Sequence, residues 1–246
     1  MICTAKPRKP RTRLRRVLAA AGGFAIVLAL LFGLCYCNGD PFSRFLSKQI
    51  VLRYLEAAYP GQTFTVCASG QDPGFQYVFE MQSPTSPDTV FHVWTDFGKI
   101  TWDTYDMEVT GGMNTRNRLA NDLYRDVSAA LAGTPLQNVS FIVQFTPEDP
   151  AGSEVSLPAG DHPPVTLDMA YDKQNLPAMA LVLDLQSAAG VSDLKAAADE
   201  ALRQAKAAME AAGIDMAAYQ VAVWSDMDLL YRSPVMLPGE IAPAGE

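Results

Sequence analysis

The protein has few side chains suited to catalysis or metal binding, and their spacing forms no recognised constellation. Its two histidines are His92, in a stretch typical of a strand, and His162, beside Asp161 in a proline-rich stretch. A zinc site needs further His or Cys ligands at fixed spacing, which neither histidine has. Cys67 with His92 could in principle form a thiolate pair, but a free cysteine packed as a small apolar residue is the simpler interpretation. The sequence therefore predicts no catalytic residue, no metal site and no cofactor.

Acidic residues are numerous but scattered, and we interpret them as solvated surface groups. Asp226-Met227-Asp228 falls far short of a calcium-binding loop, and the sequence has no phosphate loop, Gly-x-Ser-x-Gly or His-Glu-x-x-His motif. Glycoside hydrolysis needs two carboxylates about 5–10 Å apart, a separation that the sequence does not show. A cell-envelope hydrolase that uses such acids is the alternative prediction. The other scattered acids are Asp149, Asp161, Asp168 and Asp172, and none of them can be paired from the sequence.

Four polar residues near the middle of the sequence stand out as candidates for a shared network: Asp103, Tyr105, Asn114 and Arg118. They lie between a predicted strand and a predicted helix. A network of caps and turns is their ordinary role, so we expect them to be structural.

Charge divides the protein into three parts. Residues 1–16 carry seven basic side chains and no acid, and residues 17–37 carry no charge. Residues 38–246 hold 12 Lys and Arg against 27 Asp and Glu, a net charge of −15. An acidic body lacks the basic surface that phosphate backbones attract, so we expect no nucleic-acid partner. The basic residues of the tail are Lys6, Arg8, Lys9, Arg11, Arg13, Arg15 and Arg16.

The uncharged stretch 17–37 predicts a transmembrane helix, because about 20 apolar residues suffice to cross a bilayer. The basic flank 1–16 predicts a cytoplasmic N-terminus and an extracytoplasmic body. The expected location is the cell membrane, with a single pass and with the lipid bilayer as partner of residues 17–37. A cleaved signal peptide has a shorter apolar core, and a lipoprotein signal needs a small residue before Cys35 or Cys37. Both remain as alternatives to an uncleaved anchor.

Residues 38–112 predict a first module of one helix followed by a β-meander. Asp40-Pro41 is a typical helix start and Pro60-Gly61 a typical stop. The strands are expected at Phe64–Cys67, Phe75–Met81, Val90–Trp94 and Ile100–Asp103.

Residues 113–233 predict a second module, and 234–246 a flexible tail. A helix begins near Asn114-Thr115, and an Ala-rich helix over 194–212 begins after Asp193 and ends at Gly213. Residues 147–164 are a proline-rich loop. The strands are expected at 139–145, 165–171, 178–185 and 219–224, of which 178–185 is apolar enough to be central. The fold class is thus α+β: a transmembrane helix followed by two small modules, each a helix with an antiparallel sheet.

Four short motifs stand out between the uncharged stretch and the second predicted helix: Asn38-Gly39-x-Pro41, Tyr54-Leu55 with Tyr59-Pro60, Asp103 with Tyr105, and Asn114-Thr115 with Arg118-Leu119. With these motifs the sequence resembles the YfjL-like family of membrane-anchored bacterial proteins, over roughly residues 24–130. The resemblance implies a single N-terminal span and an extracytoplasmic α+β body, and it brings no activity and no catalytic residues. The helix-and-meander shape is also similar to PepSY-type modules, which are thought to inhibit or to bind, but that likeness is architectural analogy.

Taken together, these features predict a membrane-anchored extracytoplasmic interaction or regulatory protein that is not an enzyme. Its expected partner is an envelope protein, because the body is acidic, tethered and without a catalytic constellation.

Overall fold

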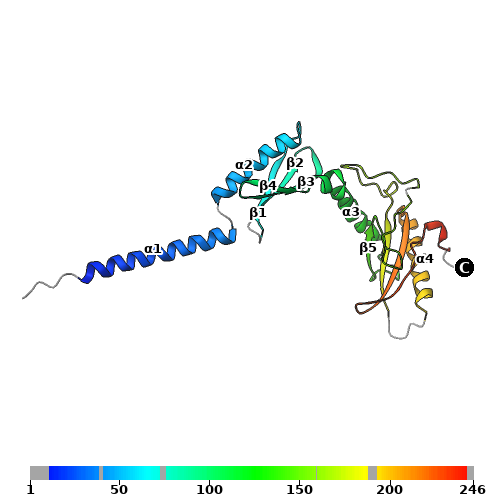
Figure 1. Cartoon of the computed structure of the whole chain (residues 1–246). Coiled ribbons are helices and arrows are strands. Elements are labelled where there is room, and N and C mark those ends of the chain that lie inside the picture. The colour runs from blue at the N-terminus through cyan, green and yellow to red at the C-terminus, as the bar shows by residue number, and fades with distance from the viewer. Residues whose placement is uncertain (1–10, 39–40, 73–75, 159, 188–192, 243–246) are drawn as a thin grey trace, which may run out of the picture. The chain divides into compact units, whose positions relative to one another are not determined.

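The protein divides into two compact units in the computed structural model, which describes residues 11–38, 41–72, 76–158, 160–187 and 193–242 (Figure 1). The first unit consists of Met1–Thr85 and Phe91–Thr104, and the second of Ser86–Val90 and Tyr105–Glu246. Each unit contains one four-stranded sheet, so the α+β class is confirmed.

The apolar stretch near the N-terminus lies in α1 (Arg11–Asn38) and is helical. Crossing a bilayer takes about 20 apolar residues within one helix. No helix among the described residues combines the length and the apolarity that this requires, so the predicted transmembrane helix 17–37 is wrong. The described residues exclude positions 1–10, and with them Lys6, Arg8 and Lys9 of the basic tail. They also exclude the side chains of Arg11, Arg13, Arg15, Arg16, Cys35 and Cys37.

The first unit packs α2 (Pro41–Ala58) on one face of its sheet (Figure 1). The helix begins at Pro41, whose fixed φ suits a first turn, and the backbone turns away after it at Gly61, where φ is 83°. The strands, in their order across the sheet, are β1 (Thr65–Gln71), β2 (Tyr77–Ser83), β3 (Ser86–Asp96) and β4 (Lys99–Asp103). The helix and the meander are confirmed. The main buried side chains are Val51, Leu55, Phe79, Met81, Phe91 and Val93.

The second unit opens with a π-helix and contains two long helices and a mixed sheet. Strand order is β5-β6-β7-β8, with antiparallel outer pairs and a parallel central pair β6/β7. Its elements are η1 (Asp106–Thr110), α3 (Met113–Leu131), β5 (Ser140–Gln144), β6 (Ala180–Gln186), α4 (Leu194–Ala212), β7 (Ala218–Ser225), β8 (Asp228–Arg232) and the 3₁₀ turn η2 (Pro238–Glu240).

The predicted all-antiparallel sheet of the second module is wrong at its centre. Between β6 and β7 the backbone passes through α4, a crossover that returns it to the sheet in the same direction. Strand β6 is buried over its first four residues, as expected for a central strand. The helix over 194–212 is confirmed: the Asp193 side chain accepts a hydrogen bond from Ala196 N–H, and Gly213 has the left-handed conformation of a C-cap.

Residues 165–171, which the structure describes, do not form the predicted strand. A turn replaces it: Met169 N–H donates to Thr166 O at 3.1 Å, and Asp168 has a left-handed φ of 57°. A strand that the sequence analysis did not predict, β8, follows β7. Residues assigned to the flexible tail contact the unit, since Met236 pairs with Tyr219 and Ile241 is buried.

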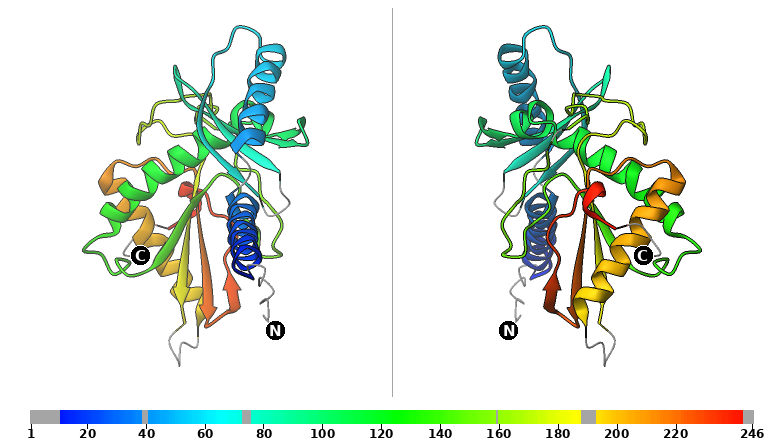
Figure 2. Two further views of the ribbon diagram at one scale, coloured as in Figure 1. Left: turned by 90° about the vertical axis from the view of Figure 1, so that its left-hand side faces the viewer. Right: turned by 90° about the vertical axis from the view of Figure 1, so that its right-hand side faces the viewer.

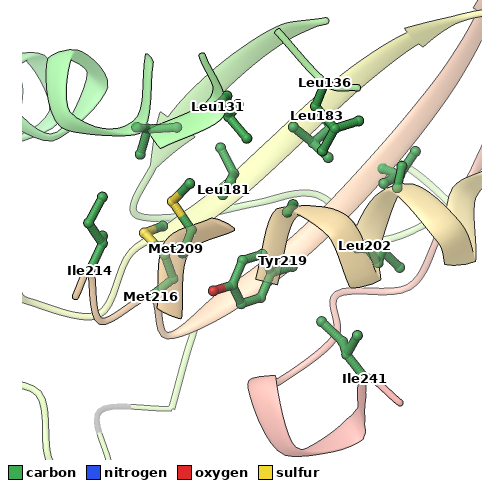
Figure 3. Packing of buried hydrophobic residues seen from close by; sticks show 14 of the residues in the cluster. Leu131, Leu136, Leu181, Leu183, Leu202, Met209, Ile214, Met216, Tyr219 and Ile241 are labelled. Carbon is green, nitrogen blue, oxygen red and sulfur yellow. The ribbon is translucent and has the colours of Figure 1, made fainter. Parts of the chain in front are cut away.

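Helices α3 and α4 cover the same face of the second sheet and share one core with it (Figure 2). Leu131 of α3, Met209 of α4 and Leu183 of β6 belong to this core, and Ile241 closes it from the C-terminal segment (Figure 3). The core fixes α3 relative to the sheet, and the N-terminal end of this helix lines the site described next.

Candidate functional site

A hollow of about 340 Å³ opens in the second unit where the first turn of α3 meets the proline-rich loop. Arg116 comes from α3, Phe145 and Thr146 follow β5, and Val165 lies at the end of the loop. Its remaining walls are mostly apolar. They include Leu157, Pro163, Pro164, Pro177 and Ala178, with the polar side chains of Ser156 and His162. We call this the first hollow.

A second hollow, of about 300 Å³, shares Arg116 and Val165 with the first. The π-helix η1 and the glycines that follow it form its other side, with Tyr105 and Leu167. Single π-helical turns are rare and often occur at functional sites. The shared side chains make the two hollows neighbours, with Arg116 in the wall of both.

Backbone geometry at Gly112 sets the start of α3 beside the second hollow. Gly112 is the N-cap of α3 and has φ 71°, a left-handed conformation that costs little only for glycine. At Gly111, an added Cβ would meet Met107 O of η1 at 2.7 Å. Both positions therefore require glycine, one for its conformation and one for its closeness to the π-helix.

Arg116 is the charged group of the site. Its guanidinium carbon lies 5.7 Å from the centre of the Phe145 ring, within the range of a cation–π interaction. Among the described residues, Arg116 forms no ion pair with an acid. This distinguishes it in a unit whose sequence holds 21 Asp and Glu against 8 Lys and Arg.

His162 presents its ring to the first hollow, and Nδ1 lies 2.9 Å from Leu176 O. Because a carbonyl only accepts hydrogen bonds, Nδ1 is the donor in this contact. His162 is therefore a polar wall group whose orientation is fixed by the backbone.

A buried ion pair holds α3 in place next to the site. Asp88, 4% exposed, accepts hydrogen bonds from Arg118 Nε at 2.7 Å, Arg118 Nη2 at 2.8 Å and Thr115 Oγ1 at 2.7 Å. The hydrogen bonds from Arg118 hold the pKa of the Asp88 carboxyl below its usual value, in spite of its burial. Arg118 Nη2 also donates to Met169 O at 2.6 Å, and the Asp88 N–H donates to Asp168 Oδ1 at 2.9 Å. The network thus joins β3, α3 and the turn after Val165.

The four polar residues singled out in the sequence are divided between the two units. Asn114 and Arg118 both bind the Asp88 segment, since Asn114 Nδ2 donates to Asp88 O at 2.9 Å and to Val90 O at 2.5 Å. Tyr105 precedes η1 and lines the second hollow. Asp103 lies at the end of β4 in the first unit.

In the first unit, Asp103 accepts hydrogen bonds from two tyrosines of the α2 region. Tyr54 Oη donates to Oδ2, and Tyr59 Oη lies 3.3 Å from Oδ1. Burial first, and then the charge of Asp103 and the neighbouring Tyr54, raise the pKa of Tyr59. Tyr59 therefore stays protonated at neutral pH and acts as a donor. Tyr59 also packs edge-on against Phe64 and Phe91. Asp103 and the two tyrosines thus connect α2 to β4.

Two other reactive side chains, His92 and Cys67, belong to the first unit and do not line either hollow. The His92 ring is 5.7 Å from the Trp94 ring, which stacks on the Trp102 ring at 4.8 Å. Cys67 is exposed, and its Sγ lies 3.1 Å from Gln82 Oε1. Within the described residues, no group of three His, Cys, Asp or Glu is arranged to hold a metal ion.

Sequence reasoning missed Arg116 and Phe145. A lone arginine in a helix and a lone aromatic after a strand form no motif, and only the fold brings them together. The signal that was available was the proline-rich loop 147–164, which the sequence analysis identified but assigned no function.

Comparison with known proteins is informative for the N-terminal part of the sequence. Residues 14–116 match the family model described as YfjL-like, N-terminal domain. The match supports the resemblance to the YfjL-like family over that part. Its last residue is Arg116, so the YfjL-like region includes η1 and the first turn of α3 but not β5 or the proline-rich loop. No curated protein and no solved structure matches the sequence.

Proposed function

We propose that the protein is a non-catalytic interaction or regulatory protein that recognises its ligand in the first hollow of the second unit. The observation that carries the proposal is the composition of that hollow: apolar walls around one cation that lacks an acidic partner among the described residues. Ligand sites in proteins typically combine mostly apolar walls with a few placed polar groups, in volumes of about 300–1,000 Å³. The first hollow, at about 340 Å³, has that size.

The hydrolase alternative receives no support from either hollow. Hydrolysis of a glycoside needs a carboxylic acid and a carboxylate facing the substrate. No Asp or Glu is among the described residues that line the two hollows. A catalytic triad would place an acid at Nδ1 of its histidine, and at His162 this nitrogen bonds the carbonyl of Leu176 instead.

The proposal is tested by filling the first hollow. Saturation-transfer NMR of the full-length protein with two uncharged probes, indole and cyclohexanol, measures whether apolar molecules bind. Ala178→Phe places a ring in the hollow, so we expect the transfer to these probes to be lost. Ala129→Phe, at an exposed position of α3, is the matched control and should bind as the native protein does. Undiminished transfer in Ala178→Phe would show that the binding site is elsewhere.

A further inference from the structure

We infer that the ligand of the first hollow presents a carboxylate to Arg116 and an apolar body to the walls. This rests on the function proposed above and names the chemical class of the ligand. The family resemblance assigns no ligand, and the residues concerned lie mostly beyond the matched region.

The first step is the state of Arg116. An arginine is charged at any physiological pH and offers five N–H donors. Arg116 lies against the Phe145 ring, which accepts none of these donors in a directed, in-plane bond. Arg118, two residues later, shows the contrast, because two of its nitrogens bind Asp88. A guanidinium over an aromatic ring is held in one place while its donors remain available to a ligand.

The second step is the charge of the ligand. The guanidinium fork matches the two oxygens of a carboxylate in a bidentate pair. A phosphate monoester carries about two negative charges at neutral pH, and Arg116 is the single Lys or Arg among the described residues of the first hollow. The surrounding unit is strongly acidic, so each extra negative charge on the ligand meets more repulsion. A singly charged carboxylate is the anion that one arginine balances.

The third step is the body of the ligand. Phe145, Leu157 and Val165 line the hollow together with three prolines, and this surface favours an alkyl or aromatic group. Thr146 and Ser156 can bond a single amide or hydroxyl of the ligand. An apolar group with one carboxylate has two sources: the C-terminal residue of a polypeptide or a small aliphatic or aromatic acid.

Calorimetric titration of the full-length protein tests the inference with matched acids and amides. The probes are N-acetyl-Leu-Phe as free acid and as C-terminal amide, and 4-phenylbutyrate with 4-phenylbutyramide. We expect each acid to bind about 10-fold or more tightly than its amide, a difference of about 1.4 kcal/mol or more, because hydrogen bonds between two charged groups are stronger than those to a neutral amide. Tighter binding of the peptide acid identifies the end of a polypeptide as the source, and tighter binding of phenylbutyrate identifies a small acid.

Variants of two arginines on the same helix provide the controls. Arg116→Gln should reduce the affinity for each acid to that for its amide, and Arg116→Lys should restore part of it. Arg125→Gln removes a side chain that is 76% exposed and pairs with Asp122, so it should bind as the native protein does. Equal binding of acid and amide, or no binding by any of the four probes, would overturn the carboxylate inference. An acid affinity that is unchanged in Arg116→Gln would also overturn it. In either case the proposed function would still hold if indole and cyclohexanol bind to the native protein and Ala178→Phe abolishes their binding.

Discussion

At the scale of single residues, the protein uses its two neighbouring arginines in different ways. Arg118 is committed to the buried carboxylate of Asp88, whereas Arg116, one half-turn away, faces the hollows. Residues two apart on a helix point in different directions. The same turn of α3 can therefore supply one side chain to stability and one to recognition.

The Asp88–Arg118 ion pair should contribute more to the free energy of unfolding than any exposed ion pair of the second unit. We expect Asp88→Ala to lower the free energy of unfolding by about 3 kcal/mol, because Arg118 Nε, Arg118 Nη2 and the buried Thr115 hydroxyl then lose their acceptor, and Asp122, at 3.8 Å from Arg118 Nη1, replaces it only in part. Arg125→Ala breaks an exposed pair on the same helix and should cost no more than about 1 kcal/mol. Denaturant unfolding of both variants measures the difference. Equal losses would mean that the Asp88 network contributes little to stability.

Lowering the pH should reduce the stability that the same network contributes. Since the folded-state pKa of Asp88 is lowered, its contribution to stability is complete above the unfolded-state pKa of about 3.9. As the pH falls, the unfolded state takes up this proton first, and the contribution is lost as the native carboxyl is protonated. Asp88→Asn should therefore show a smaller loss of stability between about pH 5 and pH 2. Asp228→Asn, at an exposed position, should retain the native pH dependence. Parallel curves for Asp88→Asn and the native protein would contradict this.

At the scale of elements, local signals predict the helices well and the connections less well. α2 and α4 begin and end where Pro41, Asp193 and Gly213 indicate, because capping is decided by nearby residues. The direction of β7 depends on where α4 returns the backbone, which no local pattern encodes. Val165, Leu167 and Met169 alternate as in a strand, but Asp168 binds the Asp88 backbone and turns the segment instead.

The site was less predictable than the elements for the same reason. Asn114 and Arg118 stood out in the sequence, but their contacts are with a segment at the start of β3, about 25 to 30 positions earlier. Arg116 and Phe145 meet only because α3 and β5 pack side by side in the second unit. A contact between two residue types without a motif becomes visible only when the fold is known.

Gly112 allows a prediction about the start of α3. Gly112→Ala should lower the free energy of unfolding by about 1–2 kcal/mol, because its φ of 71° is unfavourable for a residue with a Cβ. Space does not forbid the methyl group, since the nearest atom to it would be Val165 Cγ1 at 3.8 Å. Gly239→Ala is the control, because Gly239 has no positive φ and no atom within 4 Å of an added Cβ. Thermal unfolding compares the two, and equal midpoints would show that Gly112 bears no strain.

At the scale of the whole molecule, the net charge of the protein affects the approach of the ligand, before any direct contact forms. The protein carries a formal charge of −8 at neutral pH, so an anionic ligand approaches against a repulsive field, although Arg116 attracts it at short range. Salt screens charges farther apart than about 8–10 Å but affects the final contact less.

We therefore expect the association rate of 4-phenylbutyrate to rise with ionic strength, while that of the uncharged 4-phenylbutyramide stays constant. Stopped-flow measurements across a salt series, with choline chloride in place of sodium chloride as a check on specific ion binding, would measure both rates. A rate for the acid that falls as salt is added would mean that the local field of Arg116 outweighs the charge of the whole protein. In that case Arg116→Gln should remove the salt dependence. If repulsion by the whole protein dominates instead, the rise of the association rate with salt should become steeper in this variant, because its net charge is more negative by one.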